Sequence, residues 1–171
     1  MLCCLGLLLC LPKPGQAAGD IEVAGDILQV AIPLLGYAAT FYADDEEGRS
    51  QFYQSFFTTV GVTQVLKRSI NKQRPNGGDY SFPSGHTSAA FQGAAFIHAR
   101  YGTTYAIPAY IAASFVGYSR VESKNHWTSD VLAGAALGTA CSFYFTTPNR
   151  NYVVQPIADN GYYGLQISGN W

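Results

Sequence analysis

Most of the chain lies in long, largely apolar stretches that hold few charges, and short polar segments separate these stretches. Asp, Glu, Lys and Arg together make up 12% of the 171 residues, about half of the usual share. A chain of this length is expected to fold as one domain with a buried core. So few charges are typical of a membrane-associated or envelope protein rather than a cytosolic one. The net charge of −1 provides no basic excess for binding nucleic acid.

The apolar stretches have the length and spacing of helices. Phe52, Phe56, Val60 and Thr63 recur at helical intervals and predict one face of a helix. Strand patterns are almost absent before residue 150, so the sequence predicts an all-α bundle of about five to six helices. Helices are expected over Ile27–Ala43, Arg49–Lys72, Ser84–Tyr101, Tyr105–Tyr118 and Asp130–Phe145. The last of them is rich in Ala and Gly, which let helices approach one another closely.

The two ends of the chain differ from this helical domain. Residues Met1–Ala18 are typical of a secretory signal peptide, although no Lys or Arg precedes Leu11, and a short buried helix is the alternative. Removal of this segment takes away three of the four cysteines and leaves Cys141 as a small packing residue. The helical domain is then expected over residues 19–150. Residues 151–171 are expected to form a tail, either a short β-hairpin or an irregular segment.

Polar residues form three clusters at the ends of the predicted helices. The clusters are Lys67 with Arg74-Pro75, then Pro83-Ser84-Gly85-His86, and then Ser119-Arg120 with His126 and Asp130. Lys67 and Arg74 are seven residues apart, or two helical turns, so both are expected to point the same way. With Arg120 they form three cations, which repel one another unless an anion such as phosphate lies between them. Ser84 and Gly85 open a helix whose free N–H groups favour phosphate, and Gly85 lets an oxyanion approach the backbone.

The histidines supply the reactive groups that such a site needs. His126 and Asp130 are at positions i and i+4, which predicts neighbours on one helical face. A carboxylate on one ring nitrogen orients the other nitrogen for attack, so His126 is a candidate nucleophile. His86 follows the predicted phosphate cradle and is a candidate general acid and base. Because three cations are available, the predicted chemistry requires no metal or other cofactor.

Each of these residues has an ordinary interpretation when it is taken alone. Lys67 suits a solvated helix end, and Ser84 suits a helix N-cap. His126 with Asp130 suits a surface pair more often than a catalytic one. The occurrence of all three clusters in this order favours a functional site over these separate interpretations.

At these residues the sequence resembles the type 2 phosphatidic acid phosphatase and vanadium haloperoxidase superfamily, over about residues 50 to 145. The three clusters match the three parts of the family motif without insertions. The resemblance implies a helical bundle and metal-independent phosphate release, with His126 as nucleophile, Asp130 as its partner and His86 as general acid and base. It also implies that Lys67, Arg74, Ser84, Gly85 and Arg120 contact phosphate.

The expected activity is therefore hydrolysis of a phosphomonoester or diphosphate through a phosphohistidine. The expected substrate is a lipid such as phosphatidic acid, a polyprenyl diphosphate or lipid A, although a small phosphoester is also possible. Phosphotransfer, vanadate-dependent haloperoxidase chemistry and a non-enzymatic packing or binding role are the alternatives. The expected location is the bacterial envelope, in or on the membrane with the site facing the periplasm, and a soluble periplasmic protein is the rival.

Overall fold

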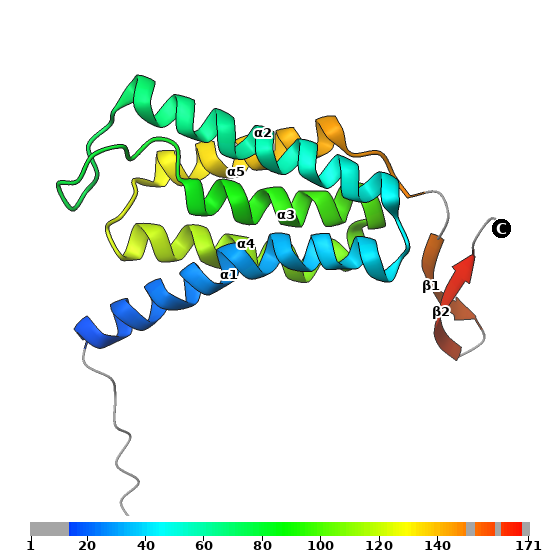
Figure 1. Ribbon diagram of the computed structural model, residues 1–171. Helices are drawn as coiled ribbons and strands as arrows, with labels where there is room; N and C mark the ends of the chain where they lie inside the picture. The colour runs from blue at the N-terminus through cyan, green and yellow to red at the C-terminus, as the bar shows by residue number, and fades with distance from the viewer. Residues whose placement is uncertain (1–13, 150–152, 160–161, 169–171) are drawn as a thin grey trace, which may run out of the picture.

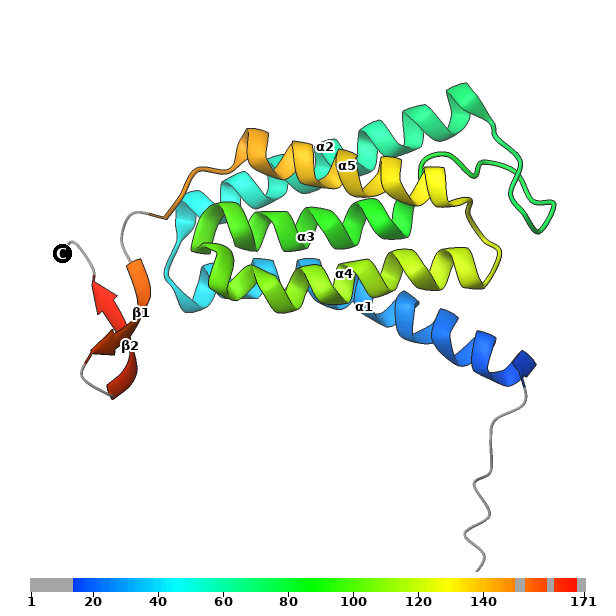
Figure 2. The same cartoon turned by 180° about the vertical axis from the view of Figure 1, so that it is seen from behind.

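The computed structural model describes residues 14–149, 153–159 and 162–168, and the side chains of residues 19–149. Over these residues the chain forms five helices and two strands (Figure 1). The elements are α1 (Pro14–Tyr42), α2 (Glu46–Ile70), α3 (Gly85–Tyr101), α4 (Thr103–Glu122), α5 (Thr128–Phe145), β1 (Val153–Asp159) and β2 (Tyr162–Ser168). The predicted all-α bundle is confirmed, and of the two forms expected for the tail, a hairpin or an irregular segment, the described strands form the hairpin. The two strands pair antiparallel, with Val153 opposite Ser168, and lie beyond one end of the bundle in both views (Figures 1 and 2).

The largest difference from the predicted helix boundaries is at the start of the chain. α1 begins at Pro14, well before the predicted start at Ile27. The acidic residues Asp20 and Asp26 interrupt its apolar pattern without ending the helix. Residues 1–13 of the predicted signal peptide lie outside the described part of the chain, and residues 14–18 form the first turn of α1.

α3 is the central helix and packs against each of the other four helices (Figures 1 and 2). Its backbone comes very close to that of α5. A Cβ at Gly134 would lie 2.5 Å from the Ser84 carbonyl oxygen, and a Cβ at Gly138 would collide with that of Ser88. The small residues of α5 therefore permit this contact, as the sequence predicts.

The interior of the bundle holds buried hydroxyl groups beside a small apolar core, and many large apolar side chains lie on the outer surface. The inward face of α2 holds Phe52 followed by the hydroxyl residues Ser55, Thr59 and Thr63. The prediction that Val60 shares this face is wrong, because its side chain lies on the exposed side. Hydroxyl groups are satisfied inside by bonds such as Thr59 Oγ1 to the Ser55 carbonyl oxygen at 2.7 Å. Most other large apolar residues of α2, such as Phe57 and Val65, point outward.

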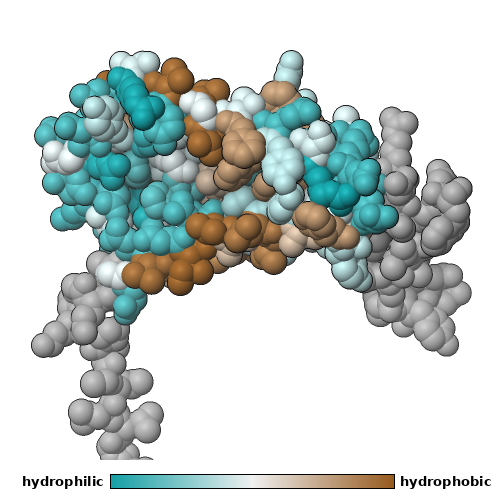
Figure 3. All heavy atoms as spheres, in the orientation of Figure 1, coloured by the Kyte–Doolittle hydropathy of each residue, from teal (hydrophilic) through white to brown (hydrophobic). Residues whose placement is uncertain are grey.

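Large apolar side chains are exposed on other helices as well, and Figure 3 shows an apolar band along one side of the molecule. Examples are Leu35 on α1, Ile111 on α4 and Leu132 on α5, each about two thirds exposed. Among the described residues, one segment is long and apolar enough to cross a membrane, Gly19–Tyr42 of α1. Extended exposed apolar surface marks a contact with another protein or with lipid.

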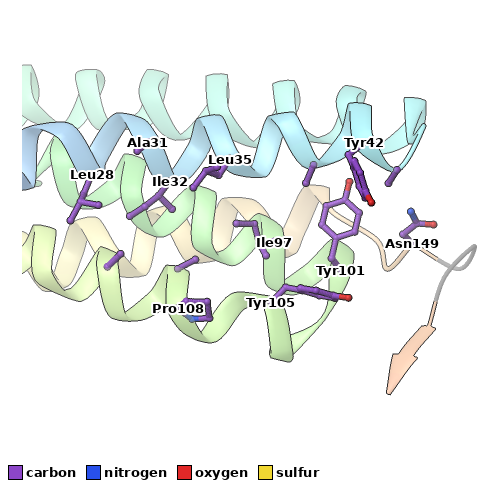
Figure 4. Close-up of a pocket in the computed structure, with 14 residues that line it drawn as sticks. Leu28, Ala31, Ile32, Leu35, Tyr42, Ile97, Tyr101, Tyr105, Pro108 and Asn149 are labelled. Carbon is purple, nitrogen blue, oxygen red and sulfur yellow. The ribbon is translucent and has the colours of Figure 1, made fainter. Parts of the chain in front are cut away.

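An apolar cavity of about 750 Å³ lies between α1, α3 and α4 (Figure 4). Its lining begins at Leu28 and Ile32 on α1 and ends near Tyr42 and Tyr101 (Figure 4). Leu28 lies two residues beyond Asp26 on α1, so the cavity starts near the end of the bundle where the polar clusters gather.

A buried ion pair stabilises the end of the bundle opposite these clusters. Arg100, near the end of α3, binds both carboxylate oxygens of Asp45, at 2.7 and 2.5 Å. Asp45 is also the N-cap of α2 and accepts a hydrogen bond from the Gly48 N–H at 2.9 Å. Arg100 further donates to the Thr147 carbonyl oxygen after α5 at 2.8 Å. This end thereby joins α2, α3 and the segment after α5.

Replacing Gly138 with Ala is expected to destabilise the protein by about 1–3 kcal/mol, because the added methyl group meets the backbone of α3, which cannot move aside alone. Gly61, on the exposed side of α2, is the matched control, because a methyl group added there would meet nothing within 4 Å. Gly61→Ala is expected to stabilise by about 0.5–1 kcal/mol through helix propensity. Thermal unfolding of both variants tests this, and equal stability of the two would contradict the close contact between α3 and α5.

Candidate active site

The three predicted clusters meet at one end of the bundle. α2 and α4 end there, and α3 and α5 begin there (Figure 1). The loops at residues 71–84 and 123–127 complete this end. The residues that α1 contributes to this end belong to the apolar segment Gly19–Tyr42, and the rest of this end lies outside that segment.

The start of α3 is held against the start of α5. Ser84 is the N-cap of α3 and is fully buried, and its N–H donates to the Asp130 carbonyl oxygen at 2.9 Å. Thr87 Oγ1 donates to Ser84 Oγ at 2.9 Å. A Cβ at Gly85 would lie 3.6 Å from Cε of Lys67, so the phosphate cradle predicted at Ser84 and Gly85 faces this lysine.

Lys67 and Arg74 approach each other through the loop and not through helical periodicity. α2 ends at Ile70, two residues before the predicted end at Lys72, and Arg74 lies in the loop beyond it. The predicted relation of two helical turns between Lys67 and Arg74 is therefore wrong. Two loop carbonyl groups hold the cations. Lys67 Nζ donates to the Tyr80 carbonyl oxygen at 2.8 Å, and Arg74 Nε donates to that of Asp79 at 3.0 Å.

Arg120 and His86 share a partner on α1. The Arg120 side chain is 2% exposed, and its NH1 donates to Asp26 Oδ1 at 2.7 Å. His86 Nε2 lies 3.1 Å from the same oxygen. The Arg120 NH2 group donates to the Glu22 carbonyl oxygen at 2.7 Å. The predicted cation and the predicted acid and base therefore lie side by side.

His126 lies in the loop before α5, because that helix begins at Thr128. The predicted direct contact between His126 and Asp130 on one helical face is wrong for this reason. The hydroxyl group of Ser81 lies between them, with Oγ 3.3 Å from His126 Nδ1 and 2.5 Å from Asp130 Oδ2. Ser81 and Asp130 are fully buried and His126 is 2% exposed, so the three residues form a buried chain.

Asp130 is surrounded by hydrogen-bond donors. Its Oδ1 accepts from Lys72 Nζ at 2.7 Å, and its Oδ2 accepts from the Trp127 N–H at 3.2 Å as well as from Ser81. Burial alone raises the pKa of a carboxyl group, but the bonds from Lys72, Ser81 and Trp127 outweigh burial and lower the pKa of Asp130. The group is therefore a carboxylate at neutral pH.

His126 is held as a neutral imidazole. Burial, and then the positive charges of Lys67 and Arg74, lower the pKa of His126 to about 3. The hydrogen-bond chain is satisfied when Nδ1 carries the proton, since Nδ1–H then donates to Ser81 and Ser81 donates to Asp130. Within the described part of the chain, Nε2 makes no hydrogen bond. Its lone pair is therefore available to an electrophile.

Three residues at this end were not predicted from the sequence: Ser81, Lys72 and Asp26. Ser81 lies in a loop with several other polar residues, and nothing in its local pattern distinguishes it. Lys72 comes after the last helical turn of α2, and Asp26 belongs to a helix far from the three clusters in sequence. Among the described residues, no group of three His, Cys, Asp or Glu side chains is arranged to hold a metal ion.

The sequence pattern of the PAP2 superfamily matches residues 51–152, a segment that contains all three clusters. The chain belongs to the PAP2 superfamily. The match leaves α1 outside, although α1 contributes Asp26 to the site. The resemblance to this family is therefore confirmed, while the roles of the individual residues stay predictions.

Relatives and solved structures of the PAP2 family support this assignment. The chain is 44% identical over 82 residues to a lipid A 1-phosphatase of Porphyromonas gingivalis, covering 46% of this chain and 18% of that protein. It is 30% identical over 133 residues to a lipid A 1-phosphatase of Helicobacter pylori, covering 72% of this chain and 66% of that protein. The chain thus spans less than two thirds of each of these relatives. A crystal structure of a transmembrane PAP2 type phosphatidylglycerolphosphate phosphatase from Bacillus subtilis superposes with a TM-score of 0.60 at 27% identity, covering 81% of this chain and 78% of that chain.

Replacing Ser81 with Ala is expected to lower kcat by about 10²-fold with little change in KM, because His126 loses its link to Asp130. Phosphate release from a lipid phosphate measures both constants. Ser69→Ala, an exposed hydroxyl deletion in the last turn of α2, is the control. Wild-type kcat in Ser81→Ala would show that the hydroxyl group has no part in orienting the ring.

The PAP2 site is also expected to lose activity above about pH 8. Burial, and then the charge of Arg74, lower the pKa of Lys67 to about 8, so its positive charge is lost as the pH rises through that value. kcat/KM should therefore fall on the alkaline side, since this constant reports the free enzyme. Lys67→Arg keeps its charge at every pH used and should move the alkaline limb upward. An alkaline limb that stays near pH 8 in Lys67→Arg would exclude Lys67 as its source.

Proposed function

We propose that the protein is a metal-independent phosphatase that removes phosphate from a phosphomonoester or diphosphate lipid through a phosphohistidine at His126. The observation that carries this proposal is the buried chain His126, Ser81 and Asp130, in which Nε2 of a neutral ring has no hydrogen-bond partner among the described residues. Burial, and then the positive charges of Lys67 and Arg74, lower the pKa of this ring, and the two cations beside it favour an anionic phosphate group. Family membership and the relatives named lipid A 1-phosphatase support the same chemistry.

In the first step, His126 Nε2 attacks phosphorus, a P–N bond forms, and the P–O bond to the leaving group breaks. His86 donates a proton to the leaving oxygen. Lys67, Arg74 and Arg120 neutralise the phosphoryl oxygens, with the N–H group of Gly85 as a further ligand. The ring becomes positively charged, and Ser81 with Asp130 stabilises that charge.

In the second step, water attacks phosphorus while His86 accepts its proton. The P–N bond breaks, inorganic phosphate leaves, and His126 returns to the neutral imidazole. The charge on the protein is the same before and after the cycle. Phosphoryl transfer of this kind depends mainly on position and charge, and the cations of the site meet that requirement.

The exposed apolar side chains support a lipid substrate and a membrane location. The outer surfaces of α1, α2, α4 and α5 carry large apolar groups, while hydroxyl groups lie inside. Lipid tails are the natural neighbours of such a surface. We propose that the protein lies in or on a bacterial envelope membrane, with the site on the periplasmic side and Met1–Ala18 serving as a signal peptide. Cleavage after Ala18 keeps Asp26 in the mature chain.

The test uses protein purified from membranes and incubated, with EDTA present, with lipid A, phosphatidic acid or undecaprenyl diphosphate in mixed micelles. Wild type should release inorganic phosphate from at least one of these lipids. His126→Ala should lower the rate at least about 10³-fold, since the nucleophile is removed. With ³²P-labelled substrate, wild type should form an acid-labile, alkali-stable phosphoprotein, and His126→Ala should form none.

His98→Ala is the matched control, because His98 lies near the far end of α3 and contacts Tyr110 and Thr103 instead of the site. This variant should keep wild-type activity. The phosphatase proposal fails if wild type releases no phosphate from these lipids, or if His126→Ala matches wild type. Recovery of active protein in the soluble fraction without detergent would contradict the membrane location alone.

A further inference from the structure

Asp26 on α1 binds the candidate acid and base and one candidate phosphate ligand at the same time. Its Oδ1 lies 3.1 Å from His86 Nε2 and 2.7 Å from Arg120 NH1. α1 precedes the segment that matches the PAP2 pattern, so the family motif does not include this carboxylate. Its side chain is 47% exposed, and that of His86 is 35% exposed, so the pair borders the open part of the site.

The position of Asp26 is fixed by contacts on both sides of it along α1. Four residues earlier, Glu22 Oε1 accepts from Asn125 Nδ2 at 2.6 Å, and the Glu22 carbonyl oxygen accepts from Arg120 NH2 at 2.7 Å. At Gly25 the helix passes so close to α4 that a Cβ would lie 2.7 Å from Arg120 NH2. These contacts hold the carboxylate next to His86.

We propose that Asp26 is a positioning residue for His86, which it orients through Nε2 so that Nδ1 exchanges the proton with the leaving oxygen and with water. This inference rests on the proposed phosphatase function. Asp26 acts through His86 and has no contact with the reacting atoms in the proposed steps. α1 is then part of the active site as well as a membrane-facing helix.

The charges around His86 explain why such a carboxylate is needed. Burial, and then the positive charge of Arg120, lower the pKa of His86, and the charge of Arg74 lowers it further. Asp26 opposes these effects by its negative charge and its hydrogen bond. Without the carboxylate, His86 faces Arg120 and Arg74 alone and holds a proton poorly. A general acid whose pKa lies far below the working pH is rarely protonated, so it seldom has a proton to give to a poor leaving group.

The first measurement is independent of activity. ¹⁵N-histidine NMR spectra of the full chain in detergent micelles are recorded against pH for wild type, Asp26→Asn and Asp26→Glu. The sequence has three histidines, so His98→Ala and His126→Ala spectra assign the His86 signals. In wild type the neutral His86 ring should carry its proton on Nε2. Asp26→Asn should shift the His86 titration to lower pH, and Asp26→Glu should restore it at least in part.

The second measurement compares two leaving groups through kcat/KM. Phosphatidic acid has a poor alkoxide leaving group that needs a proton, whereas p-nitrophenyl phosphate has a good one. Asp26→Asn should lower kcat/KM by about 10²-fold for phosphatidic acid and by less than about 5-fold for p-nitrophenyl phosphate. Asp26→Glu should regain part of the loss. Asp20→Asn, an exposed Asp earlier on α1, is the matched control and should behave as wild type.

An unchanged His86 titration in Asp26→Asn would overturn the inference. An equal loss of kcat/KM for phosphatidic acid and p-nitrophenyl phosphate in Asp26→Asn would also overturn it, because Asp26 would then have a merely structural role. A third result would also overturn it: Asp26→Asn binds orthovanadate more tightly than wild type, and its dependence on the leaving group is unchanged. Asp26 would then act by competing with phosphate for Arg120. If wild type hydrolyses neither substrate, the proposed function fails, and the NMR titration still decides whether Asp26 positions His86.

Discussion

The close contact between α3 and α5 is the constraint on which the site depends. Gly134 and Gly138 allow the two backbones to meet, and the Ser84 N–H then reaches the Asp130 carbonyl oxygen at 2.9 Å. This bond joins the candidate phosphate cradle to the residue that anchors the histidine chain. A side chain larger than hydrogen at Gly134 or Gly138 would push the two helices apart, because backbone atoms of α3 lie directly opposite.

The second organising effect is electrostatic. The chain carries few charges overall, but Lys67, Arg74, Lys72 and Arg120 lie together at one end of the bundle. Each of them binds an oxygen acceptor. Carbonyl groups of the loop bind Lys67 and Arg74, whereas carboxylates bind Lys72 and Arg120. The partners of Lys67 and Arg74 are neutral, so their positive potential remains. Burial, and then this potential, lower the pKa of His126 and keep the ring unprotonated. A neutral ring among cations is suited to attack an anionic phosphate, which an imidazolium ion cannot do.

The distribution of polarity connects this site to its proposed surroundings. On α2, Ser55, Thr59 and Thr63 face inward, and large apolar side chains such as Phe57 and Val65 face outward. Packing between the helices therefore relies on small residues and internal hydrogen bonds more than on large apolar groups, as in membrane bundles. The ion pair of Arg100 with Asp45 closes the far end, and the cations occupy the near end. The ion pairs of Arg100, Lys72 and Arg120 thus lie at the two ends of the bundle.

Local patterns in the sequence determined the helices, the three polar clusters and the family, because helix spacing and motif spacing depend on residues close together in the chain. Only the tertiary structure decided which side chains touch. The i and i+4 spacing predicted a direct bond from His126 to Asp130, but α5 starts two residues after His126 and Ser81 fills the gap. Likewise, Lys67 and Arg74 meet through a loop, and Asp26 reaches His86 from a helix sixty residues earlier. Such contacts arise from packing between distant segments, and no local periodicity encodes them.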